Sequence, residues 1–177
     1  MTGADTPHHP RVAEVAQLLR AAGAAGQVRV LPDSARTAAA AAAQLGVEVG
    51  AIANSLVFDV GGEPLLVLTS GAHRVDERLV ADLLGVPAIT RATPEFVRAH
   101  TGQPIGGVAP IGHPAPIGAL VDVELARHEQ IWAAAGHPHT VFPTSYDELL
   151  RLTEGTAAEV GPGPVAAGQP DPTGAAR

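Results

Sequence analysis

Gly106-Gly107-Val108-Ala109-Pro110-Ile111-Gly112-His113 is the stretch around which this chain is organised. Glycine and proline are the two weakest helix formers, and proline donates no hydrogen bond to a sheet. The stretch therefore predicts a rigid loop whose backbone N–H groups are open to a ligand. A second run, Gly136-His137-Pro138-His139, repeats this chemistry. We expect the two loops to line one pocket.

The composition of the 177 residues indicates a core of small aliphatic side chains, because 46% are apolar and only 3% are aromatic. The chain has no cysteine, which excludes disulfides, thiol catalysis and cysteine-ligated metals. It also has no lysine, which excludes Schiff-base chemistry. The net charge is −7 and the eleven arginines form no cluster. We therefore expect no DNA partner and only local contact with any nucleic acid.

The ends of the chain differ from its middle. Residues 1–9 are expected to be a loose lead-in, and residues 161–177, GPGPVAAGQPDPTGAAR, a disordered tail. The residues up to 160 are then expected to form one domain. No apolar run approaches the ~18 residues of a membrane span, and the N-terminus lacks the regions of a signal peptide. These features predict a cytoplasmic protein with no membrane partner.

Hydrophobic periodicity and turn residues predict strands and helices that interleave irregularly. The predicted strands cover residues 28–31, 52–60, 64–69, 88–90, 120–123, 131–135, 140–142 and 157–160. A first helix covers residues 10–22, and four more helices are predicted. Their N-caps are Asp33, Ser34 or Thr37 for the first of these, then Asp76, Thr93, and Ser145 or Thr144. This order predicts a mixed, partly antiparallel sheet with helices around it.

Several short motifs follow one another between about residues 11 and 160. They are Leu45-Gly46-Val47, Ile52-Ala53-Asn54-Ser55-Leu56-Val57-Phe58, Val67-Leu68-Thr69-Ser70-Gly71, Arg74-Val75-Asp76, the Gly106–Gly112 pattern G-G-x-x-P-x-G, and Trp132-x-x-x-Gly136. This order resembles the YbaK/ProX family of aminoacyl-tRNA deacylases, which are related to the editing domain of bacterial prolyl-tRNA synthetases.

The resemblance implies an α/β fold with a mixed, largely antiparallel, curved or barrel-like sheet surrounded by helices. It also implies a trans-editing hydrolase that cleaves the ester joining a wrong amino acid to the 3′ end of a tRNA, without a metal or organic cofactor. The implied partners are the aminoacyl-tRNA 3′ end and, as a further candidate, an aminoacyl-tRNA synthetase. One position departs from the family, because Asn54 stands where the family has a lysine. The alternative is therefore a weakened or inactive member that binds an aminoacyl group or a small ligand.

Ester hydrolysis needs donors for the oxyanion, and glycine N–H groups in a rigid loop are suitable ones. We expect Gly106, Gly107 and Gly112 to supply them, with Asn54 and His137 completing the catalytic set. The residues expected to line the substrate pocket are Ser55, Leu56, Pro110, His113 and Gly136.

A third hypothesis is a zinc-dependent hydrolase. His137 and His139 have the i, i+2 spacing of one strand face, and His113 would complete a three-histidine site. We rank it last, since Pro138 interrupts the strand. The acidic residues at the starts of two helices are interpreted as complements to the helix dipole rather than as catalytic pairs; they are Asp76, Glu77, Asp147 and Glu148.

Overall fold

The computed structural model of the chain describes residues 9–162. Residues 1–8 of the expected lead-in (1–9) and residues 163–177 of the expected tail (161–177) lie outside the described residues. The helices are α1 Pro10–Ala21, α2 Ala38–Leu45, α3 Glu77–Leu84, α4 Pro94–Thr101 and α5 Tyr146–Thr153, with short 3₁₀ turns η2 Val49–Ala51 and η3 Val123–Arg127. The strands are β1 Arg29–Val30, β2 Ile52–Val60, β3 Glu63–Ser70, β4 Thr90–Arg91, β5 Gly118–Asp122, β6 Ile131–Ala134, β7 Thr140–Thr144 and β8 Thr156–Ala158.

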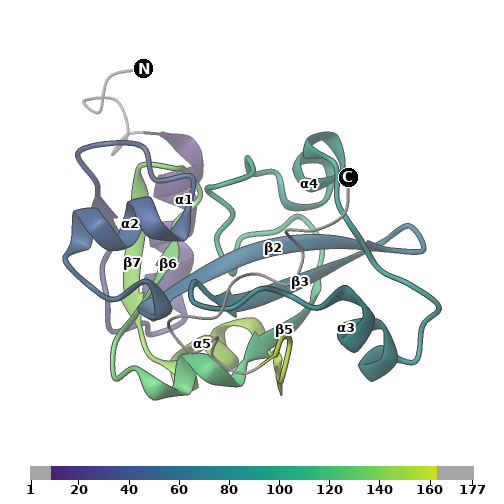
Figure 1. Cartoon of the computed structure of the whole chain (residues 1–177). Coiled ribbons are helices and arrows are strands. Elements are labelled where there is room, and N and C mark those ends of the chain that lie inside the picture. The colour runs from purple at the N-terminus through teal and green to yellow at the C-terminus, as the bar shows by residue number, and fades with distance from the viewer. Residues whose placement is uncertain (1–8, 163–177) are drawn as a thin grey trace.

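One sheet contains these eight strands, in the order β1-β7-β6-β2-β3-β5-β8, with β4 added beside β2. The pairs β2–β6, β3–β5 and β5–β8 are parallel, and the pairs β1–β7, β2–β3, β2–β4 and β6–β7 are antiparallel. Figure 1 shows β6 and β7 turned steeply against the long β2–β3 hairpin, so the sheet is curved. The expected mixed α/β fold is confirmed. Its sheet is open, because β1 and β8 are the two ends of the strand order.

Local sequence signals set the ends of the helices. One expected N-cap side chain of each of these four helices accepts a hydrogen bond from a backbone N–H of the first helical turn: Thr37 rather than Asp33 or Ser34 does so for α2, and Ser145 rather than Thr144 for α5. Three helices end at a glycine with positive φ, namely Gly46, Gly85 and Gly102. None of the helices in residues 9–162 has both the length and the apolar character needed to cross a lipid bilayer.

The strand boundaries differ from expectation where the partner strand decides them. The sequence predicts a strand over residues 88–90, but β4 begins at Thr90, because Thr90 and Arg91 are the residues that face Asp59 and Phe58 of β2. Likewise β8 ends at Ala158 instead of residue 160, where its pairing with β5 ends. The core instead takes up Ile89 and Val160, which lie just outside these strands.

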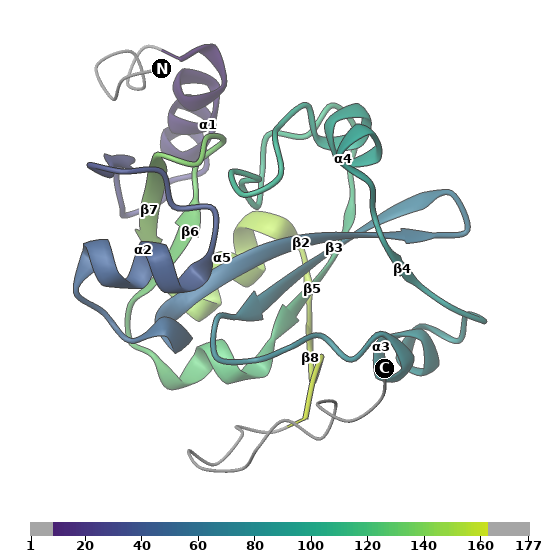
Figure 2. The same ribbon diagram turned by 45° about the horizontal axis from the view of Figure 1, so that its top comes forward.

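The core consists of three buried clusters around the sheet. The largest places α1, α4 and α5 against one face and includes Val108 and Ala109 of the Gly/Pro loop. A second cluster lies under α3, and a third joins α2 to Ile52, Trp132 and Val141. Figures 1 and 2 show α2 and α3 near opposite ends of the β2–β3 hairpin. The middle of β2 thus lies between two helices.

Candidate active site

The site begins with a gap along one edge of β2. On that edge β6 pairs with Ile52 and Ala53, and β4 pairs with Phe58 and Asp59. Residues 54–56 therefore have a strand neighbour on the β3 side only, among the strands of residues 9–162. A sheet edge without a neighbour presents unpaired backbone N–H and C=O groups.

The alternation of the β2 backbone identifies which groups face this gap. The Ile52 oxygen accepts from the Gly71 nitrogen on the β3 side at 2.8 Å, and the Val57 oxygen accepts from the Ala92 nitrogen on the opposite side at 3.1 Å. Successive residues of an antiparallel strand direct their backbone groups to alternate edges. The N–H and C=O of Ser55 therefore point into the gap between β6 and β4.

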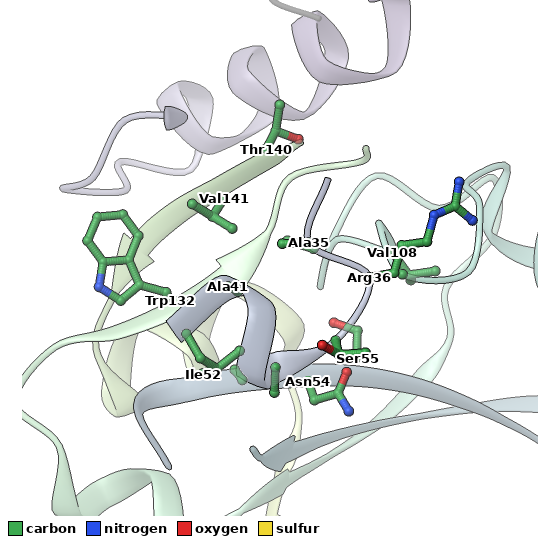
Figure 3. A pocket seen from close by; sticks show the side chains of 16 residues that line it. Ala35, Arg36, Ala41, Ile52, Asn54, Ser55, Val108, Trp132, Thr140 and Val141 are labelled. Atoms are coloured by element: carbon green, nitrogen blue, oxygen red, sulfur yellow. The ribbon is translucent and has the colours of Figure 1, made fainter. Parts of the chain in front are cut away.

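A two-lobed cleft lies over this gap. The inner lobe has a volume of about 40 Å³ and is enclosed by small and apolar residues together with the indole of Trp132; they include Ala41, Ile52, Ala133, Ala134 and Val141. The outer lobe has a volume of about 270 Å³. Asn54, Ser55, Gly106 and Val108 line both lobes and so mark their junction. Figure 3 shows Trp132 at one end of the pocket and Arg36 at the other, with Asn54 and Ser55 near Arg36.

The Gly/Pro loop provides the wall opposite β2. Its donors are not all available, because the Gly107 nitrogen donates to the Pro104 oxygen at 3.0 Å and the Ala109 nitrogen to the Gln103 Oε1 at 2.6 Å. Within residues 9–162 the N–H groups of Gly106 and Val108 have no protein acceptor. The free donors at the cleft are thus Gly106 and Val108, whereas the N–H of Gly107 is engaged inside the loop.

The two glycine-rich loops touch, but only the first lines the cleft, which differs from the prediction that both loops line one pocket. A Cβ on Gly107 would lie 2.7 Å from the carbonyl carbon of His137 and 2.8 Å from the nitrogen of Pro138. Gly136 faces α1 instead, where an added Cβ would be 3.3 Å from the Arg11 oxygen. Neither Gly136 nor His137 lines either lobe. The second loop supports the first from behind.

The end of the Gly/Pro loop also lies away from the cleft. Pro110, Gly112 and His113 line neither lobe. Gly112 packs toward Leu18 of α1, and the His113 Nε2 is 2.9 Å from the Ala109 oxygen. Burial lowers the pKa of His113. These residues shape the loop from outside rather than contact the space over β2.

Gln103 is the residue that fixes the loop, and no sequence motif points to it. Its side chain is 1% exposed. Besides accepting from the Ala109 nitrogen, its Nε2 donates to the Ile111 oxygen at 3.2 Å and to the Gly112 oxygen at 3.4 Å. One buried amide therefore holds both ends of the turn.

The three-histidine zinc site is wrong. Within residues 9–162 no group of three or more metal-ligating side chains is placed to hold an ion. His137 to His139 form a turn before β7, in which the His139 nitrogen donates to the His137 Nδ1, so the expected strand geometry is absent. Burial, together with His9, His139 and Arg36, lowers the pKa of His137.

The cleft has a distinct polar content. Among the described residues that line it there is no carboxylate and no imidazole, and the only charged side chains are those of Arg36 and Arg91. The Ser55 hydroxyl is buried and has no hydrogen-bond partner in the part of the chain that the structure describes. Buried polar groups without a partner are rare in proteins and often mark functional positions. Asn54, in contrast, is half-buried and lies in both lobes.

A separate buried polar cluster lies at the ends of β3 and β5. Asp122 accepts hydrogen bonds from the Thr69 hydroxyl and the Ser70 nitrogen, and its Oδ2 is 3.0 Å from the His73 Nδ1. None of these residues lines the cleft. With so many hydrogen bonds this carboxylate joins the two strands, and we assign it no part in the cleft.

A family model described as the aminoacyl-tRNA editing domain matches residues 32–152. The chain belongs to this family. The matched segment contains both walls of the cleft, from Arg36 to the Gly/Pro loop and β7. The expected YbaK/ProX resemblance is thereby confirmed.

Other relatives agree with this family. The chain is 34% identical over 102 residues to a proline–tRNA ligase of Nitratidesulfovibrio vulgaris, a match that covers 58% of this chain and 18% of the ligase. It is 30% identical over 121 residues to the uncharacterized protein YwhH of Bacillus subtilis, covering 68% of this chain and 76% of YwhH. A solved structure described as a candidate trans-editing enzyme for prolyl-tRNA synthetase is 40% identical, with a TM-score of 0.82, covering 88% of this chain and 99% of that one.

Proposed function

We propose that this editing-domain protein hydrolyses the ester bond between a small amino acid and the 3′-terminal ribose of a mischarged tRNA. The observation that carries the proposal is the junction of the two lobes. There the Ser55 N–H points into the gap beside β2, and the same junction is lined by Gly106 and Val108, whose N–H groups have no acceptor in residues 9–162. The family match and the candidate trans-editing relative support the same activity.

The chemistry follows from these groups. Water attacks the ester carbonyl carbon, and the negative charge that develops on the carbonyl oxygen is stabilised by backbone N–H donors and the Asn54 amide. The carbon–oxygen bond to the ribose then breaks, and the leaving oxygen takes up a proton to become a ribose hydroxyl. Because no carboxylate or imidazole of residues 9–162 lines the cleft, we assign the general base to no side chain.

The inner lobe sets the size of the amino acid. A volume of about 40 Å³ holds about three water-sized groups, since each needs roughly 10–15 Å³. Away from its junction with the outer lobe its walls are mostly apolar, with Thr140 as the polar exception among the described residues beside the indole of Trp132. A side chain as small as that of alanine, serine, cysteine or threonine fits this space, and a larger aliphatic or aromatic one does not.

The alternative is that the protein binds an aminoacyl group without hydrolysing it. Its support is Asn54, which is neutral at the position where the YbaK/ProX resemblance implies a lysine. A charge-assisted hydrogen bond is roughly twice as strong as a neutral one, so Asn54 stabilises an oxyanion less than a lysine would. Variants that change the charge at position 54 distinguish hydrolysis from binding alone.

The experiment measures release of the amino acid from tRNAs charged with Ala, Ser, Thr, Cys, Pro or Leu, with a chelator present. We expect the wild-type protein to deacylate one or more of the small-residue substrates and not Leu. Asn54→Asp keeps the side-chain shape but places a negative charge beside the oxyanion, and we expect about a 100-fold lower rate. Asn54→Lys is the comparison variant, which places a positive charge at the same position.

The outcomes discriminate the functions. Hydrolysis by the wild-type protein that Asn54→Asp abolishes supports the proposed function and this site. Activity that appears only in Asn54→Lys supports the binding function, and no activity in either protein contradicts an editing hydrolase. Wild-type rates in Asn54→Asp show that the reaction takes place elsewhere.

A further inference from the structure

The charged side chains that line the cleft are positive, whereas the net charge of the whole chain is negative. The sequence has 18 acidic residues against 11 arginines. Of the described residues, those that line the two lobes nevertheless include two arginines and no acidic residue. Two other hollows of the described surface contain carboxylates, from Glu129 and Glu148 in one and from Glu77 and Asp82 in the other.

The two arginines come from separate segments. Arg36 lies just before the N-cap of α2 and lines both lobes, and Arg91 lies on β4 and lines the outer lobe. Their backbones are well fixed. The Gly106 position packs against the Cβ of Arg36, and Arg91 is held by the pairing of β4 with β2.

Both guanidinium groups are available to a ligand. The ion pairs of the described residues occupy other arginines, namely Arg11, Arg127 and Arg151, and neither Arg36 nor Arg91 has a carboxylate within 4.0 Å in residues 9–162. Both residues are exposed, and the Arg91 guanidinium lies 5.7 Å from the centre of the Phe58 ring. Guanidinium groups bind phosphate oxygens with two parallel hydrogen bonds.

We infer that Arg36 and Arg91 bind the phosphodiester backbone of the tRNA 3′ end in the outer lobe. The inference rests on the proposed function. An amino acid in the inner lobe places its ester at Asn54 and Ser55 and the terminal ribose toward the outer lobe. The phosphate that joins the last two nucleotides is then the first charged group beyond the ribose. The two arginines are positioning residues, and they carry the positive charge that Asn54 does not.

The test compares two substrates with the same amino acid. Aminoacyl-adenosine has the ester and the ribose but no phosphate, and aminoacyl-tRNA has both. The variants are Arg36→Gln, Arg91→Gln and the double variant. Arg78→Gln is the matched control, since Arg78 is an exposed arginine of α3 outside the cleft. For each arginine variant we expect kcat/KM on aminoacyl-tRNA to fall about tenfold, mainly through KM. We expect the loss on aminoacyl-adenosine to be at least about fivefold smaller, because that substrate has no phosphate for the arginines to bind.

A binding measurement separates this inference from the hydrolysis itself. The probe is a fluorescein-labelled CCA trinucleotide that carries no amino acid, and it is titrated at several salt concentrations. On single-stranded nucleic acid, the slope of log K against log salt is about 0.7 for each phosphate that the protein neutralises, so each arginine variant should have a shallower slope by about that amount. Arg78→Gln should bind as the wild type does.

Two results overturn the inference. One is an equal reduction of kcat/KM on both substrates, which assigns the arginines to the ester or the fold. The other is trinucleotide binding whose affinity and salt slope do not change in the double variant. If the wild-type protein hydrolyses no substrate but its trinucleotide binding depends on both arginines, the result supports the phosphate-binding site and contradicts the proposed hydrolytic function.

Discussion

Gly107→Ala tests how the two glycine-rich loops hold the cleft. An added Cβ would lie 2.7 Å from the carbonyl carbon and 2.8 Å from the Cα of His137, whereas ordinary van der Waals contact begins at 3.4 Å. The opposing atoms belong to the backbone, which cannot move aside as a flexible side chain would. Overpacking of this kind destabilises a protein by typically 1–3 kcal/mol. We expect the free energy of unfolding to fall by about 2 kcal/mol, and Tm by roughly 4–8 °C for a chain of this size.

The displacement of the loop backbone by the added Cβ should also extend to the cleft. Gly106 and Val108 flank Gly107, and moving their N–H groups by several tenths of an ångström lowers oxyanion stabilisation. We expect kcat to fall by about tenfold or more, because misplacement by about 1 Å can lower a rate 100-fold.

The control for this variant is Gly118→Ala on β5, where an added Cβ meets no atom within 4 Å. Alanine is favoured over glycine in a strand by roughly 0.5–1 kcal/mol, so this control should be neutral or slightly stabilised. Urea unfolding and deacylation kinetics measure both variants. Equal stability and equal kcat for Gly107→Ala and Gly118→Ala would refute the argument that backbone contact between the loops positions the donors.

Two further variants examine the supports of the loop. Gln103→Leu leaves the buried Ala109 N–H without an acceptor. We therefore expect the free energy of unfolding, measured with urea, to fall by about 2–3 kcal/mol. A decrease below about 0.5 kcal/mol would contradict the role of the Gln103 amide in holding the loop. Burial lowers the pKa of His113 below 6.5, so the unfolded chain binds the proton more readily than the folded one, and stability should fall as the pH drops below 6.5. Unfolding at a pH of about 7.5 and of about 5.5 should show a smaller pH dependence for His113→Gln than for the wild type, and identical dependence would show that this imidazole does not contribute.

The parts of the fold that local chemistry determines can be predicted from the sequence. The helix ends follow from caps such as Thr37 and Asp76, and the hairpin follows from Gly61-Gly62, because turn and cap residues act on their immediate neighbours. The predicted strand over residues 52–60 has the same bounds as β2. These features need no knowledge of distant residues.

The distribution of donors in the Gly/Pro loop cannot be predicted in the same way. Three glycines indicate that backbone N–H groups are open, but which of them are free depends on acceptors outside the motif. Pro104 binds the N–H of Gly107, and Gln103 binds the N–H of Ala109. A buried glutamine has no distinctive sequence pattern. Val108, an ordinary apolar residue in the sequence, is therefore a donor that the motif does not indicate.

The open edge of β2 connects the fold to the proposed chemistry. A central strand normally has both edges paired, but β6 diverges after Ala53 and β4 arrives only at Phe58. The backbone donor at Ser55 is thus free because of sheet topology rather than because of its side chain. Such a site tolerates a change of the neighbouring side chain more readily than one that depends on a catalytic lysine. Under the proposed function, the two arginines supply the charge that binds the nucleic acid, and the backbone N–H groups, together with the neutral Asn54 amide, stabilise the oxyanion. We therefore expect substrate affinity to depend strongly on salt concentration and kcat to depend on it weakly.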